Sequence, residues 1–232
     1  MDTLFWGPDC WKLLHNITQN YPINPTTYNK KKYKIFFNSI HSILPCVYCR
    51  ISFKLFTKEL PIDNYLDTKT KLCKWLYLIH NKVNNKLRRE GQNIPKNPSF
   101  KSIYSKYECE LNHYNIKPMK TPGIDFLYSI VFNYSFSNDN LNKKSYTDYI
   151  HFFKSLKYVI PFKYFKTVYS SYIKEFPISK NVCNDIFKLW IFGLDETYSK
   201  LFNLNSKCFN KTNKKYEQYK AKCIINTCRS IN

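Results

Sequence analysis

The chain has 232 residues, 44% of them hydrophobic and 18% aromatic, so it is long enough to bury one large core or two small ones. The formal net charge of +21 is spread over both halves rather than gathered in one basic arm, so nucleic-acid binding is possible but not favoured. There is no apolar run of roughly 18 residues and no signal-peptide pattern at Met1–Phe5. We therefore expect a cytoplasmic protein that does not cross a membrane.

Prolines and helical spacing of apolar residues divide the first half of the chain. With only 4 Gly and 11 Pro, the composition favours helices interrupted by prolines over a glycine-rich β protein, and the predicted fold class is all-α. The spacing predicts helices over 9–20, 25–44, 45–58 and 68–89, followed by a short one over 100–109. Pro8 is expected to precede the first helix, and Pro45 to lie in the first turn of the third.

Two cysteines separated by two residues, Cys46 and Cys49, follow Pro45. At the start of a helix the dipole favours a thiolate, and a neighbouring second thiol then permits disulfide exchange. The same spacing is equally typical of half a zinc site, for which His15 or His80 would be further ligands. The pair alone does not separate a redox centre from a metal site.

A polar stripe lies beside the apolar stripe of the predicted 68–89 helix. It comprises Tyr77, His80, Asn81, Asn84 and Arg88, which are spaced to share one helix face. These side chains make a poor solvent face and a good set of donors for a heterocycle. His15 lies at helical spacing from Trp11 in the first helix, where packing of a satisfied core histidine is the simpler interpretation.

The second half contains no motif that identifies a function. A turn or linker is expected at 117–123, and helices over 145–160, 164–173 and 182–192, the last capped by Gly193. Their aromatic stripes are more typical of a helical core than of a surface that stacks single-stranded bases. The tail from about Asn205 is rich in Lys and Asn and holds Cys208, Cys223 and Cys228, for which idle thiols or a structural disulfide are the simpler interpretations.

Five short motifs occur in a fixed order along the first half. They are Trp6-Gly7-x-x-x-Trp11-x-x-Leu14-His15, Tyr21-Pro22, Pro45-Cys46-x-x-Cys49-Arg50, Trp75-Leu76 and His80-Asn81-x-Val83-Asn84. Together they resemble the Erv/ALR family of FAD-linked sulfhydryl oxidases, including the forms of large cytoplasmic DNA viruses. The resemblance covers about residues 4–108 and is specific because it needs all five motifs at once.

The resemblance implies a four-helix bundle with a short fifth helix that holds FAD against the disulfide of Cys46 and Cys49. Carried over by position, Cys49 is the flavin-proximal sulfur, Cys46 meets the substrate, and no metal takes part. The implied FAD contacts are Trp6, Gly7, Trp11, His15, Tyr77, His80, Asn81, Val83, Asn84, Leu87 and Arg88. Members of the family carry a tryptophan after the loop that follows the 68–89 helix, and in this chain Tyr104 and Tyr107 are the candidates for that position.

The resemblance also implies a reaction and its partners. Protein thiols would be oxidised to disulfides, O2 would be reduced to H2O2, and the chain would pair as a homodimer at a viral assembly site or in the virion. Cys223 and Cys228 would be candidates for a shuttle pair. The expected organisation is an oxidase domain over 1–112, a linker over 113–123 and a helical domain of unknown function with its Lys/Asn-rich tail over 124–232. A zinc-binding adaptor and a basic, aromatic nucleic-acid-binding module are the alternatives.

Overall fold

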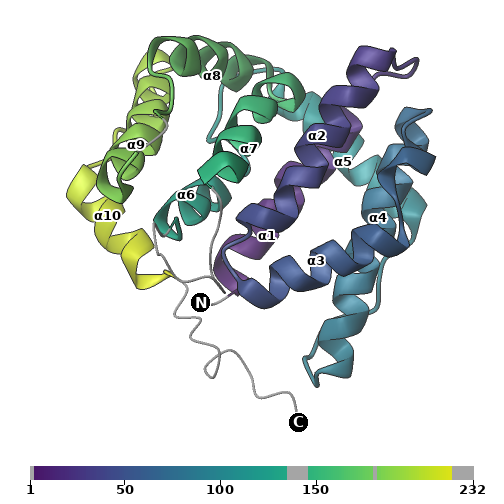
Figure 1. The fold of residues 1–232 in the computed structure, drawn as a ribbon. Coiled ribbons are helices and arrows are strands. Elements are labelled where there is room, and N and C mark those ends of the chain that lie inside the picture. The colour runs from purple at the N-terminus through teal and green to yellow at the C-terminus, as the bar shows by residue number, and fades with distance from the viewer. Residues whose placement is uncertain (1–2, 135–145, 180–181, 221–232) are drawn as a thin grey trace.

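The protein is described by a computed structural model that covers residues 3–134, 146–179 and 182–220 (Figure 1). Every regular element within these ranges is a helix, which confirms the all-α prediction. The elements are α1 (Thr3–Gln19), α2 (Thr27–Ile43), α3 (Val47–Glu59), the 3-10 helix η1 (Ile62–Tyr65), α4 (Lys69–Arg89), α5 (Phe100–Tyr114), α6 (Ile124–Phe132), α7 (Tyr146–Val159), α8 (Lys163–Glu175), α9 (Asn184–Leu201) and α10 (Phe209–Gln218). In these ranges no helix is both long and apolar enough to cross a bilayer.

Helices α1 to α5 form a bundle in which α1 packs against α4 and α5, and α3 lies between α2 and α4. Side-chain caps define several helix starts. Thr26 and Asn29 form a reciprocal capping box at α2, Thr68 accepts the N–H of Lys71 at α4, and Ser99 caps α5. The predicted second, third and fourth helices are therefore observed within a few residues of their expected bounds.

Several helix boundaries differ from prediction. The helix predicted over 100–109 continues to Tyr114. The first helix begins at Thr3 rather than Asp9, because Pro8 removes only one intrahelical N–H near the N-terminal end. Pro45 precedes the third helix, which Cys46 caps. The helix predicted to end at Gly193 continues to Leu201, and a Cβ at Gly193 would collide with the Tyr172 hydroxyl, so glycine there permits close packing of α8 on α9.

The C-terminal helices pack directly against the first bundle and do not form a separate unit. Helix α7 lies along α2 in the most extensive helix–helix contact of the described chain, and α6 packs on α1 (Figure 1). Phe36 of α2 meets Phe152 of α7 with ring centroids 5.4 Å apart, and Trp6 of α1 stacks on Phe126 of α6 at 5.8 Å. One continuous apolar core runs through both halves.

The aromatic stripes of the second half point inward. Phe152, Phe153, Phe165, Tyr169 and Phe187 are each at most 2% exposed, as the core-packing interpretation predicts. These rings are therefore not available to stack on nucleic-acid bases.

The Lys/Asn-rich tail contains a helix that the sequence pattern did not predict. Helix α10 is held by Tyr216, whose hydroxyl donates to Asp125 and whose ring stacks on Tyr128, and Phe5 of α1 stacks on Tyr219 at 3.8 Å. Tertiary contacts thus stabilise a helix with little apolar periodicity of its own. The proposed shuttle residues Cys223 and Cys228 lie outside the described residues.

The junction between α1 and α6 depends on the Asp9 carboxylate. Its oxygens accept the backbone N–H groups of Gly123 at 2.8 Å, Asp125 at 2.8 Å and Phe126 at 3.2 Å. Gly123 has φ of 92° and lacks a capping side chain, so Asp9 caps α6 from another helix. Burial raises the pKa of Asp9, and the three N–H donors oppose that rise. The segment expected to be a linker is thus attached to α1.

Replacing Asp9 by Asn tests this junction. The amide offers one acceptor oxygen and turns its own donors toward backbone N–H groups, so we expect the free energy of unfolding to fall by about 2 kcal/mol. Urea unfolding followed by circular dichroism measures the change.

The matched control is Asp63→Asn, because Asp63 pairs with Lys34 on the surface at 2.6 Å. Its loss should cost less than about 0.5 kcal/mol. Equal effects of the two substitutions would contradict the role assigned to Asp9.

Candidate functional site

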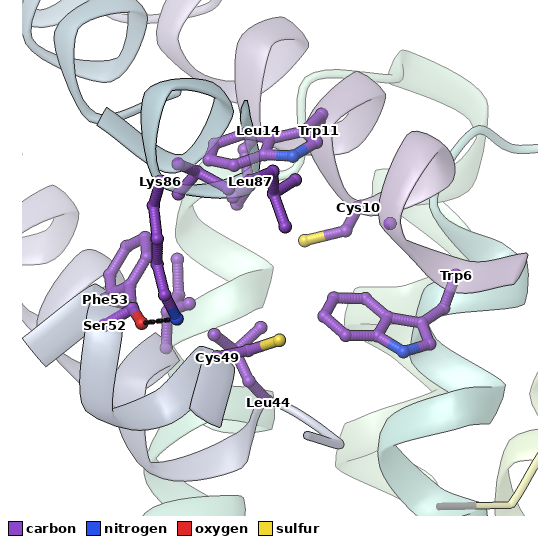
Figure 2. A pocket seen from close by; sticks show the side chains of 13 residues that line it. Trp6, Cys10, Trp11, Leu14, Leu44, Cys49, Ser52, Phe53, Lys86 and Leu87 are labelled. Atoms are coloured by element: carbon purple, nitrogen blue, oxygen red, sulfur yellow. Dashed lines mark hydrogen bonds between the residues drawn. The ribbon is translucent and has the colours of Figure 1, made fainter. Parts of the chain in front are cut away.

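A hollow of about 100 Å³ lies where α1, α3 and α4 meet (Figure 2). Its lining comprises Trp6, Gly7, Cys10, Trp11, Leu14, Ile40, Leu44, Cys49, Ser52, Phe53, Val83, Lys86 and Leu87. Six of the residues singled out from the sequence are in this list: Trp6, Gly7, Trp11, Cys49, Val83 and Leu87. Three segments far apart in the chain therefore contribute to one site.

The cysteine pair occupies the start of α3. Cys46 is the N-cap, and its sulfur accepts the backbone N–H of Cys49 at 3.4 Å. This donor and the positive end of the helix dipole both favour negative charge on the Cys46 sulfur. Arg50 ties the turn down by donating to the carbonyl oxygen of Leu44 at 2.9 Å.

The two cysteines differ in their surroundings. Cys49 lines the hollow, and its sulfur faces it (Figure 2). Cys46 does not line the hollow and is 7% exposed. The flavin-side role of Cys49 and the substrate-side role of Cys46 stay predictions, and access to Cys46 would require movement of the groups that cover it.

Helix α1 supplies a wall with an open place at Gly7. A Cβ built on Gly7 meets no heavy atom within 4 Å, so the backbone borders empty space on that side. The neighbouring Trp6 is 5% exposed, and its indole Nε1 has no hydrogen-bond partner among the described residues. The nitrogen itself is fully buried, so the indole borders the hollow through its ring carbons rather than through this donor (Figure 2).

Aromatic rings stack beside the hollow. Trp11 lies flat on His80, with centroids 3.9 Å apart and planes 6° apart, and His15 stacks on Tyr107 at 4.5 Å and 10°. His15 Nε2 lies 3.2 Å from His80 Nδ1, so one ring donates to the other. Tyr107 is thus the one of the two candidate tyrosines that joins the stack.

Both histidines are held in their neutral form. Burial lowers the pKa of His80 to about 4, and the nearby Lys106 charge adds to the effect. Burial also holds the pKa of His15 well below its usual value, with further lowering from His80 and Lys106. At neutral pH the stack is therefore uncharged, and the tautomers of the two rings decide which one donates.

The remainder of the predicted polar stripe faces the segment between α4 and α5. Tyr77 donates to the Pro98 carbonyl at 2.9 Å, and Asn84 donates to the Asn97 side chain at 3.0 Å. Arg88 donates to the Pro95 carbonyl at 2.6 Å. Asn81 is half-buried. None of these four residues lines the hollow.

Sequence reasoning missed several lining residues. Cys10, which carries no motif of its own, points its sulfur into the hollow, and Ser52 and Lys86 are hydrogen-bonded to each other on one side of it (Figure 2). Helical spacing was a usable signal, because Cys10 is one turn from Gly7, Ser52 one turn from Cys49, and Lys86 one turn from Val83.

The arrangement suits thiol chemistry beside a flat ring better than metal binding. Across residues 3–134, 146–179 and 182–220, no group of three or more His, Cys, Asp or Glu side chains is placed to hold an ion. A zinc site usually needs four such ligands. The hollow instead offers apolar walls, an aromatic ring edge and one sulfur of a cysteine pair.

Comparison with known proteins shows what the first half of the chain is similar to. Residues 8–107 match the model of the Erv1/Alr family. The chain is 41% identical over 80 residues to a probable FAD-linked sulfhydryl oxidase, R368, of Acanthamoeba polyphaga mimivirus, which covers 34% of this chain and 56% of that protein. It is 35% identical over 83 residues to the mitochondrial FAD-linked sulfhydryl oxidase ERV1 of Saccharomyces cerevisiae, covering 36% and 43%.

The similarity is confined to one part of each protein. An FAD-linked sulfhydryl oxidase of Arabidopsis thaliana matches over 104 residues at 28% identity, which is 45% of this chain and 52% of that one. The chain spans about half the length of these curated relatives. Residues 108–232, with helices α6 to α10, lie outside the range of the family match.

The neutral histidine pair predicts a pH dependence of stability. The pKa of His80 is about 4 in the fold against 6.5 in a free histidine, so the unfolded chain takes up this proton first. The free energy of unfolding should therefore fall as the pH falls from about 6.5 toward 4, with up to about 3 kcal/mol from His80, and then level off.

Urea unfolding at a series of pH values, with His80→Gln beside the unmodified chain, measures this contribution. Gln does not titrate and still hydrogen-bonds His15, so the variant should lose less stability over the same interval. Parallel curves for the two proteins would contradict the assignment.

Proposed function

We propose that this chain, whose residues 8–107 carry a domain of the Erv1/Alr family, is an FAD-linked sulfhydryl oxidase that makes disulfides in protein thiols. The observation that carries the proposal is the position of Cys49 in the wall of a hollow built from Trp6, Gly7, Trp11, Val83 and Leu87. The names of the relatives in mimivirus and yeast support the same activity.

The residues around the hollow fit a flavin. A flat ring needs apolar walls, close backbone approach and a few polar partners. The open side of Gly7 allows the close approach, and the Trp6 ring and the apolar side chains of Val83 and Leu87 provide the walls. Because Trp11 and His80 stack directly on each other, a ring inserted between them would have to part them. His15, Tyr77, Asn81, Asn84 and Arg88 would hold the rest of FAD.

The cysteine pair would carry out the exchange with substrate. An incoming thiolate attacks the Cys46 sulfur of the Cys46–Cys49 disulfide, and Cys49 leaves as a thiolate. A second substrate thiolate then attacks the mixed disulfide, releases the oxidised product and leaves Cys46 reduced. The helix N-terminus and the Cys49 N–H stabilise Cys46 as the leaving group in this second step.

FAD, when bound, would supply the final redox chemistry, the transfer of two electrons from the reduced cysteine pair to O2 with formation of H2O2. This chain contributes the position of Cys49 and a wall that excludes water on the apolar side. Neutral His15 and His80 keep positive charge off the stack at neutral pH.

The partners and the place of action are part of the proposal. Substrates would be protein thiols, and the mimivirus relative supports action in a virus-infected cytoplasm, at the assembly site or in the virion. Pairing as a homodimer is expected from the family pattern. Because α7 covers the inner face of α2, such a pair would use another surface.

Substituting Cys49 by Ser separates cofactor binding from turnover. The variant should keep the yellow flavin, since the ring contacts are retained, yet lose O2 consumption with a dithiol by at least about a thousandfold. Oxygen-electrode rates and the visible absorbance spectrum are the two measurements.

The control is Cys73→Ser, because Cys73 is buried in α4 and does not line the hollow. Substantial turnover by Cys49→Ser, or no flavin in the unmodified protein after addition of FAD, would contradict the proposed function.

Replacing Gly7 by Ala tests the close approach to the ring. Gly7 lies inside α1, so Ala should stabilise the fold slightly, by up to about 1 kcal/mol. Its methyl group would enter the space beside the hollow and weaken FAD binding by about tenfold or more. Thermal unfolding of the flavin-free protein and flavin fluorescence titration measure the two effects, and unchanged FAD affinity would contradict the assignment.

A further inference from the structure

One charged side chain lines an otherwise neutral hollow. Of the lining residues, Lys86 alone carries a charge at neutral pH, beside aromatic, aliphatic, thiol and hydroxyl groups. Figure 2 shows its aliphatic stem along one wall, with the ammonium group on the same side as Cys49. A cation at the border of a mostly apolar hollow acts more strongly on charge inside the hollow than a cation that points away from it.

Two contacts hold the ammonium group in place. Lys86 Nζ donates to Ser52 Oγ at 2.7 Å and pairs with a Glu90 oxygen at 3.4 Å. Ser52 is one turn after Cys49 on α3, so the bond joins the helix of the cysteine pair to α4. A lysine normally samples many rotamers, and these contacts restrict it to one side of the hollow.

The neighbouring cations on α4 are engaged elsewhere. Lys82 pairs with Glu59 at 2.5 Å and does not line the hollow. Arg88 is turned toward the carbonyl oxygen of Pro95. The fixed positive charge at the hollow is therefore a property of position 86, rather than of the basic composition of the helix.

We propose that Lys86, held by Ser52 and Glu90, is the residue that tunes how readily the flavin in this hollow accepts electrons. The inference rests on the proposed function, because it requires a flavin at this site. Electron uptake places negative charge on the ring system, and a protein cation near its nitrogens stabilises that charge relative to the oxidised ring. Lys86 is thus a positioning and electrostatic residue that performs no bond-breaking step.

The experiment compares Lys86→Met, Lys86→Arg and Lys82→Met in FAD-loaded full-length protein. In an anaerobic reductive titration with a reference dye, the absorbances of the flavin and of the dye together give the equilibrium constant for flavin reduction. Lys86→Met should lower this constant at least tenfold, which is about 30 mV for a two-electron couple. Lys86→Arg should remain within about threefold of the unmodified protein, because it keeps the charge.

Lys82→Met is the matched control for loss of one positive charge from α4. Its side chain is 35% exposed against 34% for Lys86, so the two lysines differ mainly in where they point. A change below twofold in Lys86→Met, or an equal change in Lys82→Met, would overturn the proposal. If the unmodified protein binds flavin, either outcome overturns the role of Lys86 and leaves the proposed function intact. If the unmodified protein binds no flavin, the proposed function itself is contradicted.

Ser52→Ala provides a second test that keeps the lysine. Releasing the ammonium group should lower the constant in the same direction and by less than Lys86→Met. If Lys86→Met retains no FAD, this variant decides the question. An unchanged constant in Ser52→Ala would then overturn the proposal.

Discussion

Three backbone N–H groups at the start of α6 converge on a single carboxylate, that of Asp9 on α1. The chain around Gly123 has no side chain that could cap α6, so this carboxylate is the cap. It lies on α1 between Gly7 and Cys10, two residues that line the hollow. The attachment of the C-terminal helices and the geometry of the candidate site are thus set on the same turns of one helix.

Helix α1 accordingly contacts both the C-terminal helices and the first bundle along its length. Phe5 meets α10, Trp6 lies between α6 and the hollow, and Leu13 packs against Gly123 so closely that a Cβ there would lie 2.7 Å from it. Trp11 and His15 face α4 and α5 on the other side. A shift of α1 that relieved strain on one side would disturb contacts on the other, because both sides are close-packed.

Sequence reasoning located the residues that depend on local spacing. Cys46 and Cys49 were identified from their separation and the preceding proline, and Trp6, Gly7, Trp11, Val83 and Leu87 from motifs whose order matches a family. Lys86 and Cys10 were missed because lysine is usually a surface residue and a single cysteine has no pattern. Helical spacing places them near the predicted residues, and the packing of α1 and α3 against α4 shows that they face the hollow.

The fold followed the same division. Apolar periodicity predicted α2, α4, α7 and α8 well, since those helices bury a continuous stripe. The extent of α9 depended on Tyr172 packing over Gly193, and α10 on contacts with Asp125 and Tyr128. Such contacts join residues far apart in the chain, so no local window of sequence contains them.

The packing of α7 on α2 determines which part of the chain can be produced alone as a stable protein. The family match ends at residue 107, yet Phe36 of α2 is fully buried and its ring meets Phe152 of α7, with centroids 5.4 Å apart. A fragment that ends just after the matched region would expose the apolar, α7-facing surface of α2 to water, and we expect it to aggregate. The region matched by the family model is therefore smaller than the part of the chain that must be expressed to obtain a protein with its apolar surfaces buried.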